Sequence, residues 1–371
     1  MNFPATLFGY IARRFFMWFS GVFVLFLMLI FIGDFVDLTH RTSARADIGA
    51  GLLLKMAALK LPYEGQQVMP FAVLGGSILA LFFLTRSREL IIARAAGISV
   101  WQFLAPAIAI AFLVGAIGVT MFNPLASTAQ TEYKLLENTV LKNQADALQL
   151  TASGLWLRQS DSEGTQAVIH ALSRPTGGQD GTADMVLGDV TFLFFRDNDH
   201  LVRRIDAETA RLESGKWHVR DGTDWRPDRD KVLFTEEIVP TNMTRQRIEE
   251  SFASPDTMSF WKLPAFIDLL ELSGFSAQKH RLYFDSLLAR PFMLCAMVLI
   301  AAIFSLRMQR RGGTTALMIG GVCAGFLVYF LSDVIFALGS SGTIPVVLAA
   351  WTPAVISTLL GTFVLLHLED G

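Results

Sequence analysis

The chain has 371 residues, of which 52% are hydrophobic and 17% are charged, and its formal net charge is −2. This apolar content exceeds that of a typical soluble domain and indicates a membrane protein. The charge balance leaves no basic surplus for a nucleic acid. Cys295 and Cys323 both lie in apolar runs, so the sequence supports neither a disulfide framework nor a Cys/His metal site.

The first apolar run covers Phe15 to Gly33 and follows Arg13 and Arg14. As a helix it is long enough to cross about 30 Å of hydrocarbon. A cleaved signal peptide is the competing interpretation, because Ala44-Arg45-Ala46 resembles a cleavage site. The run is longer than a usual signal-peptide core and five further spans follow, so a membrane helix is the prediction.

The second apolar stretch, Gly51 to Leu84, contains charged residues and two prolines, which predict a long kinked helix. A third span runs from about Val100 to Phe122 and is expected to close at Asn123-Pro124. Three more spans follow the middle of the chain, at about Ser276 to Leu306, Thr314 to Leu338 and Pro345 to Leu366. We therefore expect an α-helical membrane protein with six spans in two sets of three.

The middle of the chain is rich in charge and glycine, which predicts a soluble domain inserted between the spans. The expected domains are 1–124, 125–262 and 263–371. Leu125 to Asn143 has helical periodicity, and a short helix at Leu263 to Leu272 leads back to the membrane. Turn signals such as Ser214-Gly215 and Asp221-Gly222 separate six β-rich runs. These runs predict an all-β, jelly-roll-like domain and are Gly154 to Arg158, Gln166 to Leu172, Val186 to Arg196, Leu201 to Ala207, Lys216 to Arg220 and Lys231 to Val239.

A short charged segment, Thr85 to Ser99, separates the second span from the third. On a helix its residues divide into two faces. We expect one face to lie against the protein's own membrane body; it holds Ile91, Ile92, Ala95 and Ile98. We expect the other to seat another protein; it holds Glu89, Leu90, Ala93, Arg94 and Gly97, with Ser87 and Arg88 beside it. Gly97 is also expected to end the helix. The alternative is a solvated loop in which Arg86 neutralises Glu89.

Known catalytic and nucleotide-binding motifs are absent from the sequence. It contains no Gly-x-x-x-x-Gly-Lys-Ser/Thr, no His-Glu-x-x-His and no Gly-x-Ser-x-Gly. We therefore expect no metal, no cofactor and no catalytic residue, and any energy must come from another chain.

Ionisable residues in or beside the spans are costly in hydrocarbon, so they usually face a cavity, a partner or a headgroup. We expect outward-side basic residues, among them Lys60, His280 and Arg281, to line a cavity for an anionic amphiphile. The alternative is that they pair with acids of the same chain, as Lys60 and Glu64 would at positions i and i+4.

Basic residues predict the orientation. Basic residues occur near the N-terminus, in the Thr85 to Ser99 segment, and between the fourth and fifth spans. With six spans, these three segments lie on the same side of the membrane. The loop Gly339 to Thr343 lies on the opposite side and has no basic residue. By the positive-inside rule, that shared side and both termini are cytoplasmic, and the β domain lies outside.

The residues Ser-Arg-Glu-Leu, followed by Ala-Arg-Ala-Gly-Ile-Ser, resemble the cytoplasmic coupling helix of the LptF/LptG family of lipopolysaccharide export permeases. The resemblance covers essentially the whole chain, and GLWLR and GTIPVVLAAWTPAVISTLLG are closer to the LptG branch. It implies a non-catalytic ABC transporter subunit of the bacterial inner membrane, with the β domain in the periplasm. The implied partners are an LptF-like permease as heterodimer mate, an LptB-like ATPase dimer, an LptC-like bitopic protein, a periplasmic LptA-like bridge and lipopolysaccharide itself.

The resemblance also implies roles for particular residues. Glu89 and its neighbours would sit in a groove of the ATPase. Basic residues at the outer end of the first span would meet lipid phosphates, but that end reads GDFVDLTHR here, with acids nearest the membrane. Arg41 and Arg45 are the remaining candidates for this contact.

Two other classes of function were weighed. A membrane-embedded lipid-modifying enzyme would need clustered acidic, His or Ser residues at an outer face, and the sequence shows only dispersed ones. A secondary transporter with inverted repeats would need short, Gly/Pro-broken spans at matching positions of the two halves, which are also lacking.

Overall fold

The chain forms two compact units, which are described separately. The helical unit comprises Met1–Leu136, Asp256–Trp261 and Gln278–Gly371, and the sheet unit comprises Glu137–Pro255 and Lys262–Ala277. The computed structural model describes residues 5–43, 49–87, 89–95, 97–142, 149–151, 154–160, 166–177, 185–196, 200–213, 216–227, 229–241, 254–272, 275–305 and 314–369.

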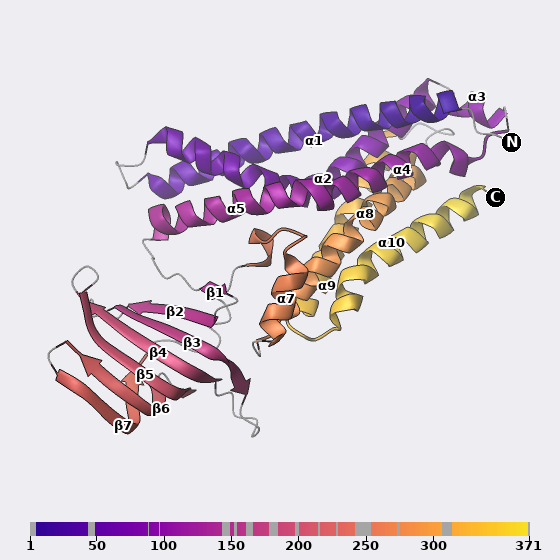
Figure 1. Cartoon of the computed structure of the whole chain (residues 1–371). Helices are drawn as coiled ribbons and strands as arrows, with labels where there is room; N and C mark the ends of the chain where they lie inside the picture. The colour runs from indigo at the N-terminus through magenta and orange to yellow at the C-terminus, as the bar shows by residue number, and fades with distance from the viewer. Residues whose placement is uncertain are drawn as a thin grey trace. The chain divides into compact units, whose positions relative to one another are not determined.

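Within the described residues, six helical stretches are long and apolar enough to cross a membrane, which confirms the expected number of spans. The helices of the helical unit are α1 (Ala5–Thr42), α2 (Ala50–Arg86), α3 (Glu89–Ala95), α4 (Val100–Ile117), α5 (Asn123–Glu137), α8 (Gln278–Ser305), α9 (Thr314–Ser340) and α10 (Val346–Glu369). Helix α3 lies at the same end of this unit as the start of α1 and the end of α10 (Figure 1).

The spans differ in how far they are covered by other helices. In the most apolar stretch of each span, 67% of the residues of α8 are buried, but only 11% of those of α1 and of α9. Helix α8 is therefore the centre of the unit, in contact with α2, α4, α9 and α10. Helices α1 and α9 leave most of their apolar surface open.

Helices α1 and α2 approach each other closely at Gly76. A Cβ atom at this position would lie 2.6 Å from the Cα atom of Phe19, so only a glycine allows the two backbones to come this near. Phe19 itself is buried in the main apolar cluster of the unit. The position of α1 against α2 therefore depends on this one missing side chain.

The third span does not close at Asn123-Pro124 as expected. A π-helical segment, η1 (Gly118–Phe122), joins α4 to α5, which runs through the proline and on into η2 (Asn138–Lys142). Proline cannot donate to the carbonyl four residues back, and here the indole Nε1 of Trp261 donates to that oxygen of Thr120 at 3.0 Å. The helix continues because a distant side chain replaces the lost hydrogen bond.

The π-helical segment lies beside a buried polar cluster. The amide of Gln66 on α2 lies 3.4 Å from the Gly118 carbonyl, and the amide of Asn123 lies 3.4 Å from both Gln66 and Tyr283. Arg290 of α8 reaches Gln66 at 3.4 Å. Side-chain hydrogen bonds thus connect α2, α5 and α8 where the α-helical pattern is interrupted.

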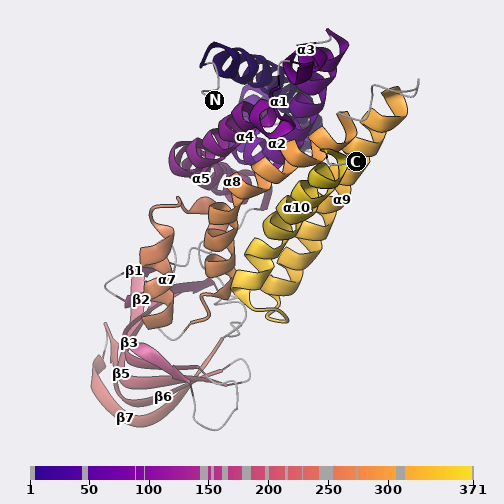
Figure 2. The same ribbon diagram turned by 90° about the vertical axis from the view of Figure 1, so that its right-hand side faces the viewer.

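The sheet unit holds one antiparallel sheet of seven described strands in sequential order (Figure 2). They are β1 (Gln149–Thr151), β2 (Gly154–Ser160), β3 (Gln166–Gly177), β4 (Met185–Arg196), β5 (His200–Glu213), β6 (Lys216–Arg226) and β7 (Arg229–Pro240), with η3 (Pro255–Thr257) and α7 (Leu263–Leu272) after them. The inserted all-β domain is confirmed. Among the described strands each pairs with its sequence neighbours, so the crossover that completes a jelly roll is not among these connections.

One of the predicted turns is wrong, because strand β6 runs through it. Asp221-Gly222 lies inside the strand rather than ending it, and β5 likewise continues beyond Ala207. Asp221 adopts a left-handed conformation with φ of 51°, which aspartate tolerates, so the backbone changes local direction without leaving the sheet. The other turn, Ser214-Gly215, lies outside the described residues.

We predict that Gly76→Val lowers the stability of the helical unit by about 1–3 kcal/mol, because the new side chain must displace the backbone of α1. Thermal unfolding in detergent measures the effect. Gly21→Val is the matched control, since a Cβ atom at Gly21 would meet nothing within 4 Å. Equal stability of the two variants would contradict the close approach of α1 and α2.

Candidate functional site

Helix α3 is a single short helix with well-defined ends. After it, Gly97 has φ of +81°, its N–H donates to the Arg94 carbonyl at 2.9 Å, and the N–H of Ile98 donates to the Ala93 carbonyl at 3.1 Å. This is the Schellman arrangement, which requires a residue such as glycine at the left-handed position. Ser99 then begins α4 with a capping box to Gln102. The predicted stop at Gly97 is confirmed.

The two faces of α3 match those expected from the sequence only in part. Arg94 and Gly97, expected on the partner side, are exposed, and Ile98, expected on the membrane-body side, packs against an apolar cluster of neighbouring helices. Leu90 and Ala93, expected to face a partner, are 3% and 8% exposed and belong to the apolar cluster that also contains Ile11 and Leu84. Ile92, expected to lie against the membrane body, is 66% exposed. Leu90, Ala93 and Ile92 were assigned to the wrong side because a two-turn helix with apolar residues on both sides does not identify its buried side; the neighbouring helices do.

The exposed surface of α3 is therefore apolar at its centre and basic beside it. Ile92, Arg94 and Ala95 are exposed, as is Gly97 just beyond the helix. Arg88 lies outside the described residues. An exposed isoleucine next to an arginine is suited to a groove that offers apolar contact and negative charge.

Glu89, at the start of α3, is bound by side chains of its own chain. Its Oε1 atom receives hydrogen bonds from Arg14 Nη1 at 3.1 Å, Tyr10 Oη at 3.3 Å and Ser87 Oγ at 2.8 Å. Arg14 also donates to the Tyr10 hydroxyl, and its guanidinium lies 5.7 Å from the Tyr10 ring centre. We call these four residues the Glu89 network; its salt bridge is to Arg14 of α1 rather than to the nearby Arg86.

The Glu89 network was not predicted. From the sequence, Arg14 was expected only to mark the orientation of the chain, and Tyr10 had no expected role. The sequence does indicate that Tyr10 and Arg14 act together, because they are four residues apart and lie on one face of a helix. Nothing local could assign that face to Glu89, which is 75 residues further along the chain than Arg14.

The residues expected to contact lipid phosphates are not gathered into one open basic site. Lys60 lies 2.7 Å from Asp34 Oδ1 of α1 and 3.1 Å from Glu64 Oε1, so the predicted Lys60–Glu64 pair is confirmed. Arg41 is paired with Asp37 at 2.9 Å. Two candidate cations on α1 and α2 are therefore already neutralised by carboxylates of the same chain.

The other candidates differ in their exposure. His280 is buried at 6% exposure, whereas Arg281 beside it on α8 is exposed. Arg45 lies outside the described residues. Between His280 and Arg281, Arg281 is the one placed to meet a ligand from outside the helix bundle.

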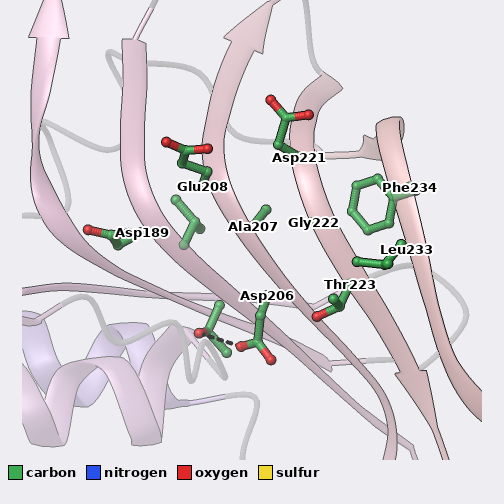
Figure 3. A pocket seen from close by; sticks show the side chains of 11 residues that line it. Asp189, Asp206, Ala207, Glu208, Asp221, Gly222, Thr223, Leu233 and Phe234 are labelled. Atoms are coloured by element: carbon green, nitrogen blue, oxygen red, sulfur yellow. Dashed lines mark hydrogen bonds between the residues drawn. The ribbon is translucent and has the colours of Figure 1, made fainter.

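The sheet unit carries an acidic hollow of about 630 Å³ (Figure 3). Asp189 on β4, Glu208 on β5 and Asp221 on β6 lie opposite one another across the sheet, at the rung where the alternation of buried residues changes phase on all three strands. Asp206 lies lower in the hollow and accepts a hydrogen bond from Thr191 at 2.8 Å. Four carboxylates repel an anionic headgroup, so this face is unsuited to a lipid phosphate.

The strands bordering this hollow are joined by a partly buried ion cluster. Arg203 on β5 binds Asp224 on β6 at 2.9 Å and also Glu237 on β7. Burial favours the neutral form of Asp224, but the hydrogen bond and charge of Arg203 outweigh it and lower the pKa of this carboxyl. Likewise, burial opposes the charge of Arg203, yet its bonds to the two carboxylates raise the pKa of the guanidinium.

A second hollow, of about 350 Å³, lies between α8, α9 and α10 and is almost entirely apolar. Its lining includes Phe304, Val328, Leu331, Ile356 and Leu360. Thr352 and Ser357 supply its few hydroxyl groups. Such a lining suits a hydrocarbon chain and contains no charged side chain that could bind a charged group.

The helices, the inserted sheet and the exposed short helix together indicate a class of protein. Among the described residues, no group of three or more His, Cys, Asp or Glu side chains is placed to hold a metal ion. The fold combines six membrane helices, an inserted sheet and a short helix exposed at one end. It is the fold of a membrane permease subunit.

The comparisons identify the family. The model of the family described as lipopolysaccharide export system permease LptF/LptG matches residues 9–367. The chain belongs to this family of permeases and is a multi-pass protein of the inner membrane. It is similar to the lipopolysaccharide export system permease protein LptG of Haemophilus influenzae, with 22% identity over 84% of this chain and 85% of the relative. It is also similar to LptG of Escherichia coli strain K12, with 24% identity over 86% of each chain.

We predict that Lys60→Met destabilises the helical unit by about 2 kcal/mol, because Asp34 and Glu64 then face each other without a cation in a partly buried place. Adding Asp34→Asn should restore most of the loss. Thermal unfolding in detergent measures both effects.

Lys55→Met is the control for this experiment. Lys55 pairs with Glu132 at 2.6 Å, but both side chains are about half exposed, so the expected loss is under about 1 kcal/mol. If Lys60→Met were as stable as the wild type but failed in lipid extraction, the lysine would serve the lipid rather than its carboxylate neighbours.

Proposed function

We propose that the chain is the non-catalytic permease subunit of an ABC transporter that extracts lipopolysaccharide from the inner membrane and passes it to a periplasmic bridge. ATP is hydrolysed by a separate LptB-like dimer that docks on α3. The observation that carries this proposal is the exposed, firmly terminated α3 helix at one end of the membrane helices. The sequence itself has no phosphate-binding loop, so the ATPase must be another chain.

The exposed side of α3 is the proposed seat in the ATPase. Ile92 would enter an apolar groove, and Arg94 would meet an acidic side chain at its rim. Leu90 and Ala93, on the opposite side of α3, would hold it against the membrane helices, because they are buried in the same apolar cluster as Leu84. This exchanges Leu90 and Ala93 with Ile92 between the two faces expected from the sequence, and it keeps Arg94 on the partner side and the role of the segment.

An LptF-like permease is the proposed mate on the open sides of α1 and α9. Only 11% of the apolar stretch of each of these helices is buried within this chain, although both are long enough to cross the membrane. Pairing two such subunits would enclose a cavity between them, open to lipid from the bilayer. The LptC-like protein and the LptA-like bridge would act on the outer side, where the sheet unit is proposed to lie.

The orientation rests on the positions of basic residues. Helix α3 shares one end of the helical unit with the start of α1 and the end of α10 (Figure 1). Arg13 and Arg14 lie in the first turns of α1. The positive-inside rule makes this the cytoplasmic end. The sheet unit is inserted between the third and fourth spans and would therefore be periplasmic.

Lipid phosphates have one proposed contact among the described residues. Arg281 is exposed at the start of α8, which is the outer end in this orientation. Arg41 and Lys60 would contact phosphate only after leaving their carboxylate partners, and His280 only after a movement that uncovers it. The acidic hollow of the sheet is not proposed to bind the headgroup.

We predict that Ile92→Ser weakens binding of the LptB-like ATPase at least about tenfold, since an isoleucine loses its buried apolar contact. Affinity of the purified permease pair for the ATPase measures this. Leu366→Ser is the control, because Leu366 is 45% exposed near the end of α10 and lies outside the proposed seat. If both Ile92→Ser and Glu89→Lys left binding and lipid extraction unchanged, α3 would not be the docking element.

We predict that a membrane-impermeant maleimide labels Asp230→Cys in intact spheroplasts and labels Ala95→Cys only after the membrane is opened. Both positions are exposed, on β7 and α3. Cys295 and Cys323 are free and are first replaced by serine. The reverse labelling pattern would overturn the proposed orientation.

A further inference from the structure

We propose that Arg14 and Tyr10 are positioning residues that make α1 move together with α3. The inference rests on the proposed function, in which an ATPase displaces α3, and it adds the route by which that displacement enters the membrane helices. The Glu89 network is the point where α3, α1 and the end of α2 are joined by directional bonds.

The contacts are unevenly distributed on the Glu89 carboxylate. Among the described residues, the donors from Tyr10, Arg14 and Ser87 all reach Oε1. The Ser87 hydroxyl at the end of α2 has a single proton, for which the Phe83 and Leu84 carbonyls, at 3.0 and 3.2 Å, compete with Glu89 Oε1. At this oxygen the bonds from Tyr10 and Arg14 connect α3 to α1, and the Ser87 hydroxyl connects α3 to the end of α2 when its proton points to Glu89.

The Glu89 network is partly buried. The side chains of Arg14 and Glu89 are 26% and 34% exposed. A charge-assisted hydrogen bond in such a place is stronger than one at an open surface. It can also still be reached by a docking protein.

The other contacts of α3 cannot fix its position along α1 in the same way. Leu90 and Ala93 pack in an apolar cluster with Ile11 of α1, and apolar contact has no preferred direction. Helices in apolar contact can slide by small distances at little cost. The Glu89–Arg14 bond opposes such sliding, so a push on α3 becomes a movement of α1.

Helix α1 is the span for which such movement has the largest effect on transport. It is among the two least covered spans of the chain and is proposed to line the cavity shared with the partner permease. Moving α1 changes that cavity directly. Moving the buried α8 would first require the chain's own core to rearrange.

The test compares Arg14→Gln with Arg13→Gln in the complete complex of both permeases and the ATPase. Arg13 is the neighbouring residue, carries the same charge and is exposed. We expect Arg14→Gln to retain the ATPase and its ATP hydrolysis but to extract about tenfold less lipopolysaccharide per ATP hydrolysed. We expect Tyr10→Phe to reduce that ratio about twofold, and Arg13→Gln to leave it unchanged.

A reversed pair separates positioning from a purely structural role. Arg14→Glu alone should lose extraction per ATP, and Arg14→Glu combined with Glu89→Arg should recover most of it. If Arg14→Gln fails to fold, this pair and Tyr10→Phe decide the matter. A folded reversed pair without recovery, or an unchanged ratio in Tyr10→Phe, then overturns the inference.

Failure of this inference is distinguishable from failure of the proposed function. If Arg14→Gln extracts as much lipid per ATP as Arg13→Gln while the ATPase stays bound, the relay through Arg14 is wrong and the docking of α3 stands. If the wild-type pair does not bind the ATPase at all, the proposed function itself is wrong.

Discussion

The position of α3 at its end of the helical unit depends on one carboxylate. Glu89 holds α3 to α1 through Arg14 and Tyr10 and to the end of α2 through Ser87. Without it, α3 would be attached only by its apolar side and by the short chain segments at its ends. A seven-residue helix of this kind has little stability of its own, so its place and direction are set by these tertiary contacts.

The membrane helices were predictable because their signal is long and strongly apolar. Six spans and an inserted antiparallel sheet follow from hydropathy and from alternation, which are properties of local sequence. The end of the third span was not predictable from Pro124, because helix continuation there depends on Trp261, which is far away in sequence. The interpretation of Asp221-Gly222 as a turn was also wrong because the local sequence does not show the neighbouring strands. A left-handed aspartate can lie within a strand when the alternation of buried and exposed residues shifts at the same position in those strands.

The candidate site was predictable in its location but not in its details. The segment containing Glu89 was identified from charge between two apolar runs, and Gly97 from its place after a short helix. Which face is buried was not predictable, since Leu90 and Ile92 are equally apolar and only Ile11 and Leu84 of neighbouring helices distinguish them. Lys60 was expected to line a cavity for an anionic amphiphile, whereas in the structure it pairs with Asp34, 26 residues earlier.

The central claim is that α1 and α3 move as one body when the ATPase acts. The most direct measurement is the distance between spin labels at Leu25→Cys on α1 and Ala95→Cys on α3, in the complete complex with Cys295 and Cys323 replaced by serine. Both labelled positions are exposed. We predict the same distance distribution in the nucleotide-free and the ATP-trapped complex for the wild type, and a shifted one on trapping for Arg14→Gln. A wild-type distance that shifts on trapping as much as that of the variant would contradict the account.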